Sequence, residues 1–120
     1  MPIIPAFLLK KLYVDGSLKC TDQGVSLSLK NTLAPGTIIG VSSLEIDGTE
    51  HPAERVTFGR QGAARPADRI TPAAPLAFNL NQELEIHVAG LRLEPGTHSV
   101  KVRVNTKEVG ELNIQIEDHV

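Results

Sequence analysis

The sequence predicts an all-β protein: a single antiparallel β-sandwich domain over residues 1–120, with about seven to eight strands in an immunoglobulin-like arrangement. Apolar and polar residues alternate with a period of two in several stretches, whereas the three- and four-residue spacing of a helix is almost absent. The turn-forming pairs Asp-Gly and Pro-Gly separate these stretches. A small β-barrel is the alternative architecture.

The first ribbon of the sheet is expected around the Asp-Gly pair at residues 15–16. A two-residue turn there would pair Tyr13 with Leu18, because such a turn joins strands that lie directly opposite each other. The same turn would also pair Lys11 with Cys20. The ribbon therefore either has a longer turn or lies at an edge of the sheet.

Two alternating stretches, GVSLSLKN at 24–31 and ELEIHV at 83–88, predict strands with one buried and one solvated face. The side chains expected to face the core are Val25, Leu27, Leu29, Leu84, Ile86 and Val88. The Pro-Gly pairs within 33–37 and 93–97 precede further strands and predict type II turns.

A second Asp-Gly pair, at 47–48, predicts a two-residue turn that would place Glu45 opposite Glu50. Like charges in this position repel each other, and a carboxylate pair of this kind can act as acid and base. More often the two carboxylates are solvated or bridged by an arginine, which the Arg-bearing segment that follows could supply. Both interpretations stay open on the sequence.

The last two alternating stretches, THSVKVRV at 97–104 and ELNIQIE at 111–117, predict a hairpin whose tip is 107–109. The register that puts both apolar stripes on one face leaves Gly110 available for a bulge. In this register the cross-strand pairs are Val104 with Leu112, Val102 with Ile114, and Val100 with Ile116.

The segment 59–75 lacks the alternation and is rich in Ala and Pro. Loops of this length are uncommon in compact domains and are often functional or mobile. We therefore expect this loop to contact a partner, together with the apolar N-terminal segment from Ile3 to Leu9. The candidate contact residues are Ile3, Ile4, Phe7, Leu8, Arg60, Arg65 and Arg69.

The composition, with 41% apolar and 22% charged residues, is that of a water-soluble globular domain. A formal charge of −2 offers no basic footprint for nucleic acid, and no run approaches the roughly 20 apolar residues that cross a membrane. Lys10 and Lys11 follow the apolar N-terminal run, whereas a signal peptide has its basic residues first. The single cysteine, Cys20, fits a reducing compartment, so we expect a cytoplasmic protein.

Motifs for catalysis and for cofactor binding are missing from the sequence. It contains no GxSxG, no GxxxxGK[ST] and no GxGxxG after a strand, so neither an acyl-transfer elbow nor a cofactor is expected. The four histidines are too dispersed for a metal motif, although a site assembled from different strands stays open. These histidines are His51, His87, His98 and His119.

Three stretches, SLKCTDQGVSLSLKN, LEIDGTEHPAERVTF and LEPGTHSVKVRV, resemble in this order the small β-subunit family of C-glycoside deglycosidases. In that family the small subunit is a β-sandwich that assembles with a larger barrel-type subunit bearing the metal and the catalytic residues. The resemblance implies an accessory role and carries no catalytic residue onto this chain. Residues 1–40 also look like short chains that have the label hydroxymethylglutaryl-CoA reductase.

Three functions follow as hypotheses. The favoured one is a non-catalytic accessory subunit, or protein-interaction module, that docks on a larger enzyme subunit, possibly of C-glycoside deglycosidase type. The second is a self-assembling structural homo-oligomer. The third is a small independent enzyme, whose turnover would be lost when Glu50 or His98 is changed to alanine.

Overall fold

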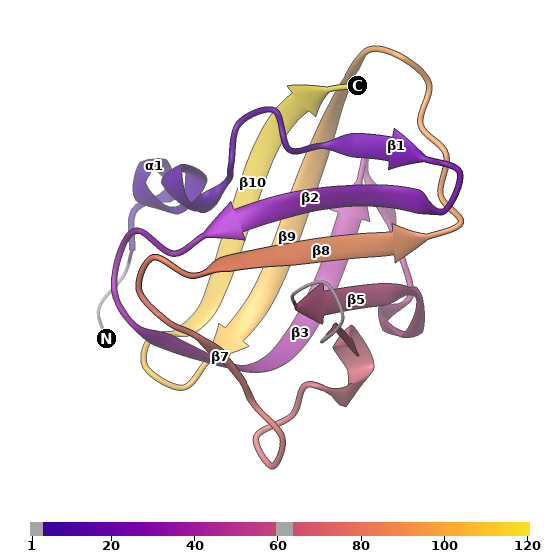
Figure 1. Ribbon diagram of the computed structural model, residues 1–120. Helices are drawn as coiled ribbons and strands as arrows, with labels where there is room; N and C mark the ends of the chain where they lie inside the picture. Colours follow the sequence, from indigo (N-terminus) through magenta and orange to yellow (C-terminus); the bar gives the residue numbers. More distant parts are fainter. Residues whose placement is uncertain (1–3, 60–63) are drawn as a thin grey trace.

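The computed structural model describes residues 4–59 and 64–120, whose strands form two antiparallel sheets packed face to face (Figure 1). One sheet has the strand order β1-β2-β8-β5-β6, and the other has the order β10-β9-β3-β4, with β7 paired to β3. The series β1-β2-β8-β5 and β10-β9-β3-β4 match the A-B-E-D and G-F-C-C′ orders of immunoglobulin-like sandwiches. The predicted sandwich is confirmed, and the described strands do not close into a barrel.

Most of the sandwich is made by five longer strands, and short strands and single helical turns join them. The strands are β1 (Lys19–Thr21), β2 (Gly24–Lys30), β3 (Gly36–Ile46), β4 (Thr49–Glu50), β5 (Val56–Gly59), β6 (Arg65–Pro66), β7 (Leu76–Phe78), β8 (Glu83–Ala89), β9 (Thr97–Thr106) and β10 (Gly110–His119). The helical turns are α1 (Ala6–Leu9), η1 (Lys10–Leu12), η2 (Ala53–Arg55) and η3 (Ala67–Arg69).

The core lies between the two sheets and is filled from alternate positions of each strand. All six side chains predicted to face inward from β2 and β8 are buried. Because Leu27 lies opposite Ile86, the apolar stripes of these two strands form one continuous surface. The facing sheet contributes Leu44 and Val102, and Phe58 of β5 is fully buried between the layers.

The β9–β10 hairpin has the predicted register. All three expected pairs, from Val104 with Leu112 to Val100 with Ile116, lie opposite each other. The tip consists of Lys107–Val109, and Gly110 has a φ of 76°, as the position after a three-residue hairpin loop requires. The period-two pattern was sufficient here because a slip by one residue would turn every apolar side chain to solvent.

The two-residue turn at Asp47-Gly48 is also confirmed. Both residues have positive φ, 53° and 82°, so Glu45 lies opposite Glu50 as expected. One of the two Pro-Gly predictions is wrong, because Gly36 is the first residue of β3 and does not have a positive φ. Gly96, in the other pair, has a positive φ and exchanges two backbone hydrogen bonds with Val120.

The predicted first ribbon around residues 15–16 is wrong. Pro5 starts a helical turn instead, and its carbonyl accepts hydrogen bonds from the amides of Leu8 and Leu9. Because the chain is helical from Ala6 to Leu12, Lys11 cannot pair with Cys20, and Cys20 lies opposite Val25 in the β1–β2 pair. Tyr13 forms an isolated bridge with Leu29.

The described part of the Ala/Pro/Arg segment, residues 64–75, has structure of its own. It contains β6 and η3, and the side chains of Ala67 and Ile70 are buried in the core. The guanidinium of Arg65 donates hydrogen bonds to the carbonyl oxygens of Ala74 and Pro75, at 2.9 and 2.7 Å. Among the residues that the structure describes, no helix has the length and apolar character to span a bilayer.

Two phenylalanines provide a matched test of this core. Phe58→Ala removes a ring that has no solvent exposure, and we expect it to lower the free energy of unfolding by about 3–5 kcal/mol. Phe7→Ala removes a ring that is 65% exposed and should change it by less than about 0.5 kcal/mol. Urea unfolding followed by circular dichroism measures both values, and equal values would contradict the assigned core.

Candidate functional site

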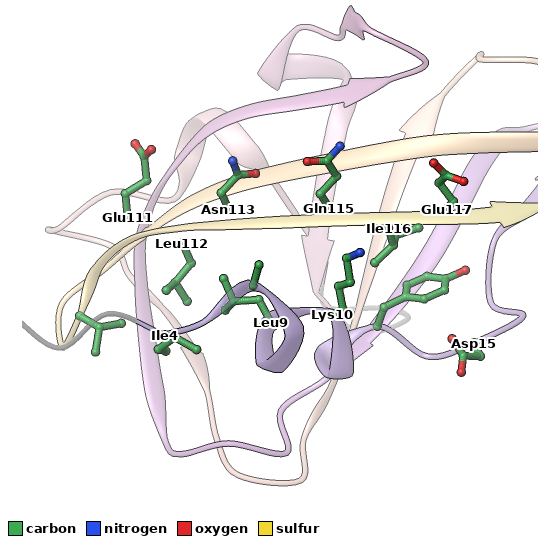
Figure 2. A pocket seen from close by; sticks show the side chains of 13 residues that line it. Ile4, Leu9, Lys10, Asp15, Glu111, Leu112, Asn113, Gln115, Ile116 and Glu117 are labelled. Carbon is green, nitrogen blue, oxygen red and sulfur yellow. The ribbon is translucent and has the colours of Figure 1, made fainter.

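A groove with a volume of about 1060 Å³ lies between the N-terminal helical turns and strand β10. α1 and η1 pack along β10 and form one wall, and β10 itself forms the other (Figure 2). Leu112 and Ile116 point from β10 toward the helical turns, where Ile4 and Leu9 meet them. The groove therefore has an apolar floor.

The rim of the groove is polar and carries more negative than positive charge. Alternate residues of β10 point away from the core and are exposed, which places Glu111 and Glu117 on the same face of the strand. Asp15 adds a third carboxylate to the lining, and Lys10 adds one ammonium group. The lining residues on the outer face of β10 are Glu111, Asn113, Gln115 and Glu117.

β10 is also an edge strand, because its only sheet partner among the described strands is β9. In an edge strand every second residue turns its amide and carbonyl groups away from the sheet, where they can pair with another strand. No hydrogen bond from the backbone of residues 111–117 to the described residues outside the β9 ladder is present. The groove thus combines apolar surface with a row of free backbone donors and acceptors.

The N-terminal wall is held in place by Tyr13, which is buried at one end of the groove. Its hydroxyl donates a 2.6 Å hydrogen bond to the Asp118 carboxylate and accepts one of 3.0 Å from the Leu18 amide. The bond from Tyr13, followed by those from the amides of His119 and Gly16, holds the pKa of Asp118 below its usual value. Burial and the same carboxylate raise the pKa of Tyr13.

A second carboxylate, Asp47, joins two hairpins at the same end of the sheet, where His98 lies opposite Asp118. His98 Nδ1 lies 2.5 Å from Asp47 Oδ2, and its Nε2 lies 2.6 Å from the Glu94 carbonyl oxygen. Both partners can accept a hydrogen bond, so the protonated imidazole, in which both ring nitrogens donate, satisfies both contacts. The bond to Asp47, followed by that to Glu94, raises the pKa of His98, and the bond from His98 is the largest cause of the lowered pKa of Asp47.

The predicted contact residues separate into two groups. Ile4 lines the groove, and Phe7 and Leu8 lie on α1 beside it. Arg65 and Arg69 belong to the segment around η3, which packs against other elements, and Figure 1 shows it on the opposite side of the molecule from α1. Ile3 and Arg60 lie outside the described residues.

Within the carboxylate pair, Glu45 forms an ion pair with a lysine, and among the described residues neither a lysine nor an arginine bridges it to Glu50. Lys101 lies opposite Glu45 on β9, and its ammonium is 3.8 Å from the Glu45 carboxylate. The four histidines do not converge: within residues 4–59 and 64–120, no group of three or more His, Cys, Asp or Glu side chains could hold a metal ion. His98 instead forms a hydrogen bond and a salt bridge with Asp47.

The sequence pattern did not single out the outer face of β10 as a site. Its alternation of Glu, Asn, Gln and Glu was visible in ELNIQIE, but nothing local indicates that this strand lies at an edge. The helical turns were also missed, although Leu9, Leu12 and Tyr13 have helical spacing and are all buried.

The Tyr13 contact provides a stability prediction. Tyr13→Phe keeps the ring and removes the hydroxyl, so the Leu18 amide and the Asp118 carboxylate each lose a partner. We expect the free energy of unfolding to fall by about 1–3 kcal/mol, as for a hydrogen bond to a charged group. Urea unfolding measures it, with the exposed Glu117→Gln as a control; a loss below about 0.5 kcal/mol would contradict the anchoring role.

The His98–Asp47 pair provides a pH prediction. The folded-state pKa of His98 lies above 6.5, so its stabilising contribution is complete below about pH 6.5 and is lost as the pH rises through the folded pKa. The folded-state pKa of Asp47 lies below 3.8, so its contribution is present above that pH and is lost as the pH falls through the folded value. The pair therefore stabilises the fold most between these limits.

We expect the urea midpoint of the wild-type chain to fall from pH 6 to pH 8.5 more steeply than that of His98→Gln. Asp47→Asn removes the other charge of the pair, and asparagine tolerates the positive φ of this turn. It should flatten the same pH dependence. Parallel curves of urea midpoint against pH for the wild type and both variants would show that the His98–Asp47 pair does not cause this pH dependence.

Comparison with known proteins assigns the chain to a family. A family model described as hydroxymethylglutaryl-CoA reductase, N-terminal domain, matches residues 8–120, which include η1 and all ten described strands. No curated protein matches the chain. Neither comparison supports the resemblance to the small subunits of C-glycoside deglycosidases. The chain belongs to the family of hydroxymethylglutaryl-CoA reductase N-terminal domains.

Proposed function

We propose that this chain is a non-catalytic accessory module that docks on a larger enzyme chain through the groove between α1 and β10. The observation that carries the proposal is the coincidence of an apolar floor with the free edge of a ten-residue strand. Apolar contact supplies affinity, and free backbone groups supply direction and register to a docking segment. A groove of this kind is suited to a polypeptide.

The family assignment supports an accessory role. The description names one domain of an enzyme, which is consistent with a chain that works beside a separate catalytic part. A reductase chain is accordingly one candidate for the larger partner. A large subunit of the C-glycoside deglycosidase type, suggested by the sequence resemblance alone, is the other.

The described residues do not fit a nicotinamide dinucleotide. Binding of its pyrophosphate in the usual way needs a glycine-rich turn between a parallel strand and the N-terminus of a helix. The strand pairs of the described part of the chain are antiparallel, and its one α-helix has four residues. We therefore assign no reduction step to this chain.

Affinity capture of the tagged full chain from its native lysate, followed by native mass spectrometry, tests the proposal. We expect one larger chain to be retained in a fixed ratio and to carry the enzymatic activity of the complex. Asn113→Trp places a bulky ring on the rim of the groove and should abolish retention.

Glu85→Trp is the matched control, because Glu85 is an exposed strand residue on the other sheet. It should leave retention unchanged. Recovery of the chain alone, or equal retention by both variants, would contradict docking through the groove.

A further inference from the structure

Resting on this proposed function, we infer the chemistry of the segment that occupies the groove: an extended stretch of the partner chain, with Lys or Arg at alternate positions, that adds as a strand to the free edge of β10. The backbone of the segment pairs with β10. Its basic side chains lie beside Glu111 and Glu117, and its other side chains pack on the apolar floor.

Strand lengths single out this edge of the sandwich. The described sheets end at β1, β6 and β10 and, beside β3, at β4 and β7. All of these except β10 have two or three residues, and strands this short cannot hold an added strand in register. β10 has ten residues and is backed by the groove along most of its length. Strand addition at its free edge would bury the apolar floor of the groove as well.

The outer face of β10 decides the charge of the occupant. Residues that lie opposite each other in paired strands have their side chains within contact distance on the same face. An added strand would therefore bring its outward side chains next to Glu111 and Glu117, with two uncharged amides between them. Basic side chains gain from this position, and acidic ones are repelled.

The internal neighbour of β10 also carries basic side chains on its outer face, opposite the two amides of β10. On β9, Arg103 lies opposite Asn113 and Lys101 lies opposite Gln115, so the outer face of β9 is basic where that of β10 is polar. The Arg103 guanidinium also comes within 3.8 Å of the Glu111 carboxylate. A basic strand on the free edge would repeat on one side of β10 the charge pattern that the fold uses on the other.

The same residues disfavour a second copy of this chain as the occupant when its pairing is centred on Ile114 or Gln115. Antiparallel self-pairing centred on Ile114 sets Leu112 of one copy opposite Ile116 of the other, which keeps the apolar residues together. That register also sets Glu111 opposite Glu117 at both ends, and like charges directly opposite are destabilising. Moving the centre to Gln115 relieves this repulsion but sets Asp118 opposite Leu112.

Synthetic peptides test the inference on the full chain. The probe is an acetylated and amidated strand of alternating Lys and Val, with Thr in place of some lysines for solubility, and the control peptide has Glu in place of every Lys. We expect amide NMR shifts at residues 111–117 and in α1 with the basic peptide, and about tenfold weaker binding of the acidic one. Binding of the basic peptide should also weaken as salt rises.

A charge-reversed variant makes the test specific to β10. Glu111→Lys/Glu117→Lys should invert the preference in favour of the acidic peptide, whereas Glu85→Lys, on the other sheet, should leave it unchanged. Equal binding of both peptides, or shifts that fall outside β10 and α1, would overturn the inference. Self-association of the chain that Asn113→Trp abolishes would overturn it in favour of a second copy.

The two proposals can fail separately. If the larger chain is captured and Asn113→Trp releases it, while the peptides show no charge preference, the occupant is not a basic strand but the accessory role holds. If the basic peptide binds β10 and no larger chain is captured, the edge accepts such strands and the accessory role is wrong.

Discussion

The groove depends on one hydrogen bond, which the buried Tyr13 hydroxyl donates to the Asp118 carboxylate near the end of β10. The helical turns from Ala6 to Leu12 are too short to be stable alone and are held by what they pack against. By fixing the residue directly after them, the Tyr13–Asp118 bond places Leu9 over the apolar residues of β10. A strand edge thereby becomes one wall of a groove.

The same end of the sandwich is tied a second time by Asp47 and His98. Asp47 accepts hydrogen bonds from the His98 ring and from the Ser99 amide, which joins the β3–β4 turn to the beginning of β9. Because His98 lies opposite Asp118, the two ties share one rung of the β9–β10 ladder. The Asp118 contact holds the N-terminal segment against β10, and the Asp47 contacts hold the β3–β4 turn against β9. The chemistry of the groove lies in the surface beside them.

The sequence predicted the sandwich and the β9–β10 register because an alternating strand with one buried face has a single favourable register. It failed at the N-terminus, where α1 is one turn long and Asp15-Gly16 looked like a hairpin turn. Tertiary contact with β10 stabilises the helical turns, and the helical spacing of Leu9, Leu12 and Tyr13 is too short a pattern to predict them. ELNIQIE revealed an exposed polar face on β10 but not its free edge, since strand order depends on the whole chain.

Hydrogen–deuterium exchange of the chain, free and in complex with the captured partner, tests the docking account most directly. An added strand would engage the outward amides of β10, so alternate residues between 111 and 117 should exchange more slowly in the complex, together with residues of α1 and η1. Amides of β2 and β8, in the other sheet, should be unchanged. Protection that appears around η3 instead, with β10 exchanging as in the free chain, would contradict the account.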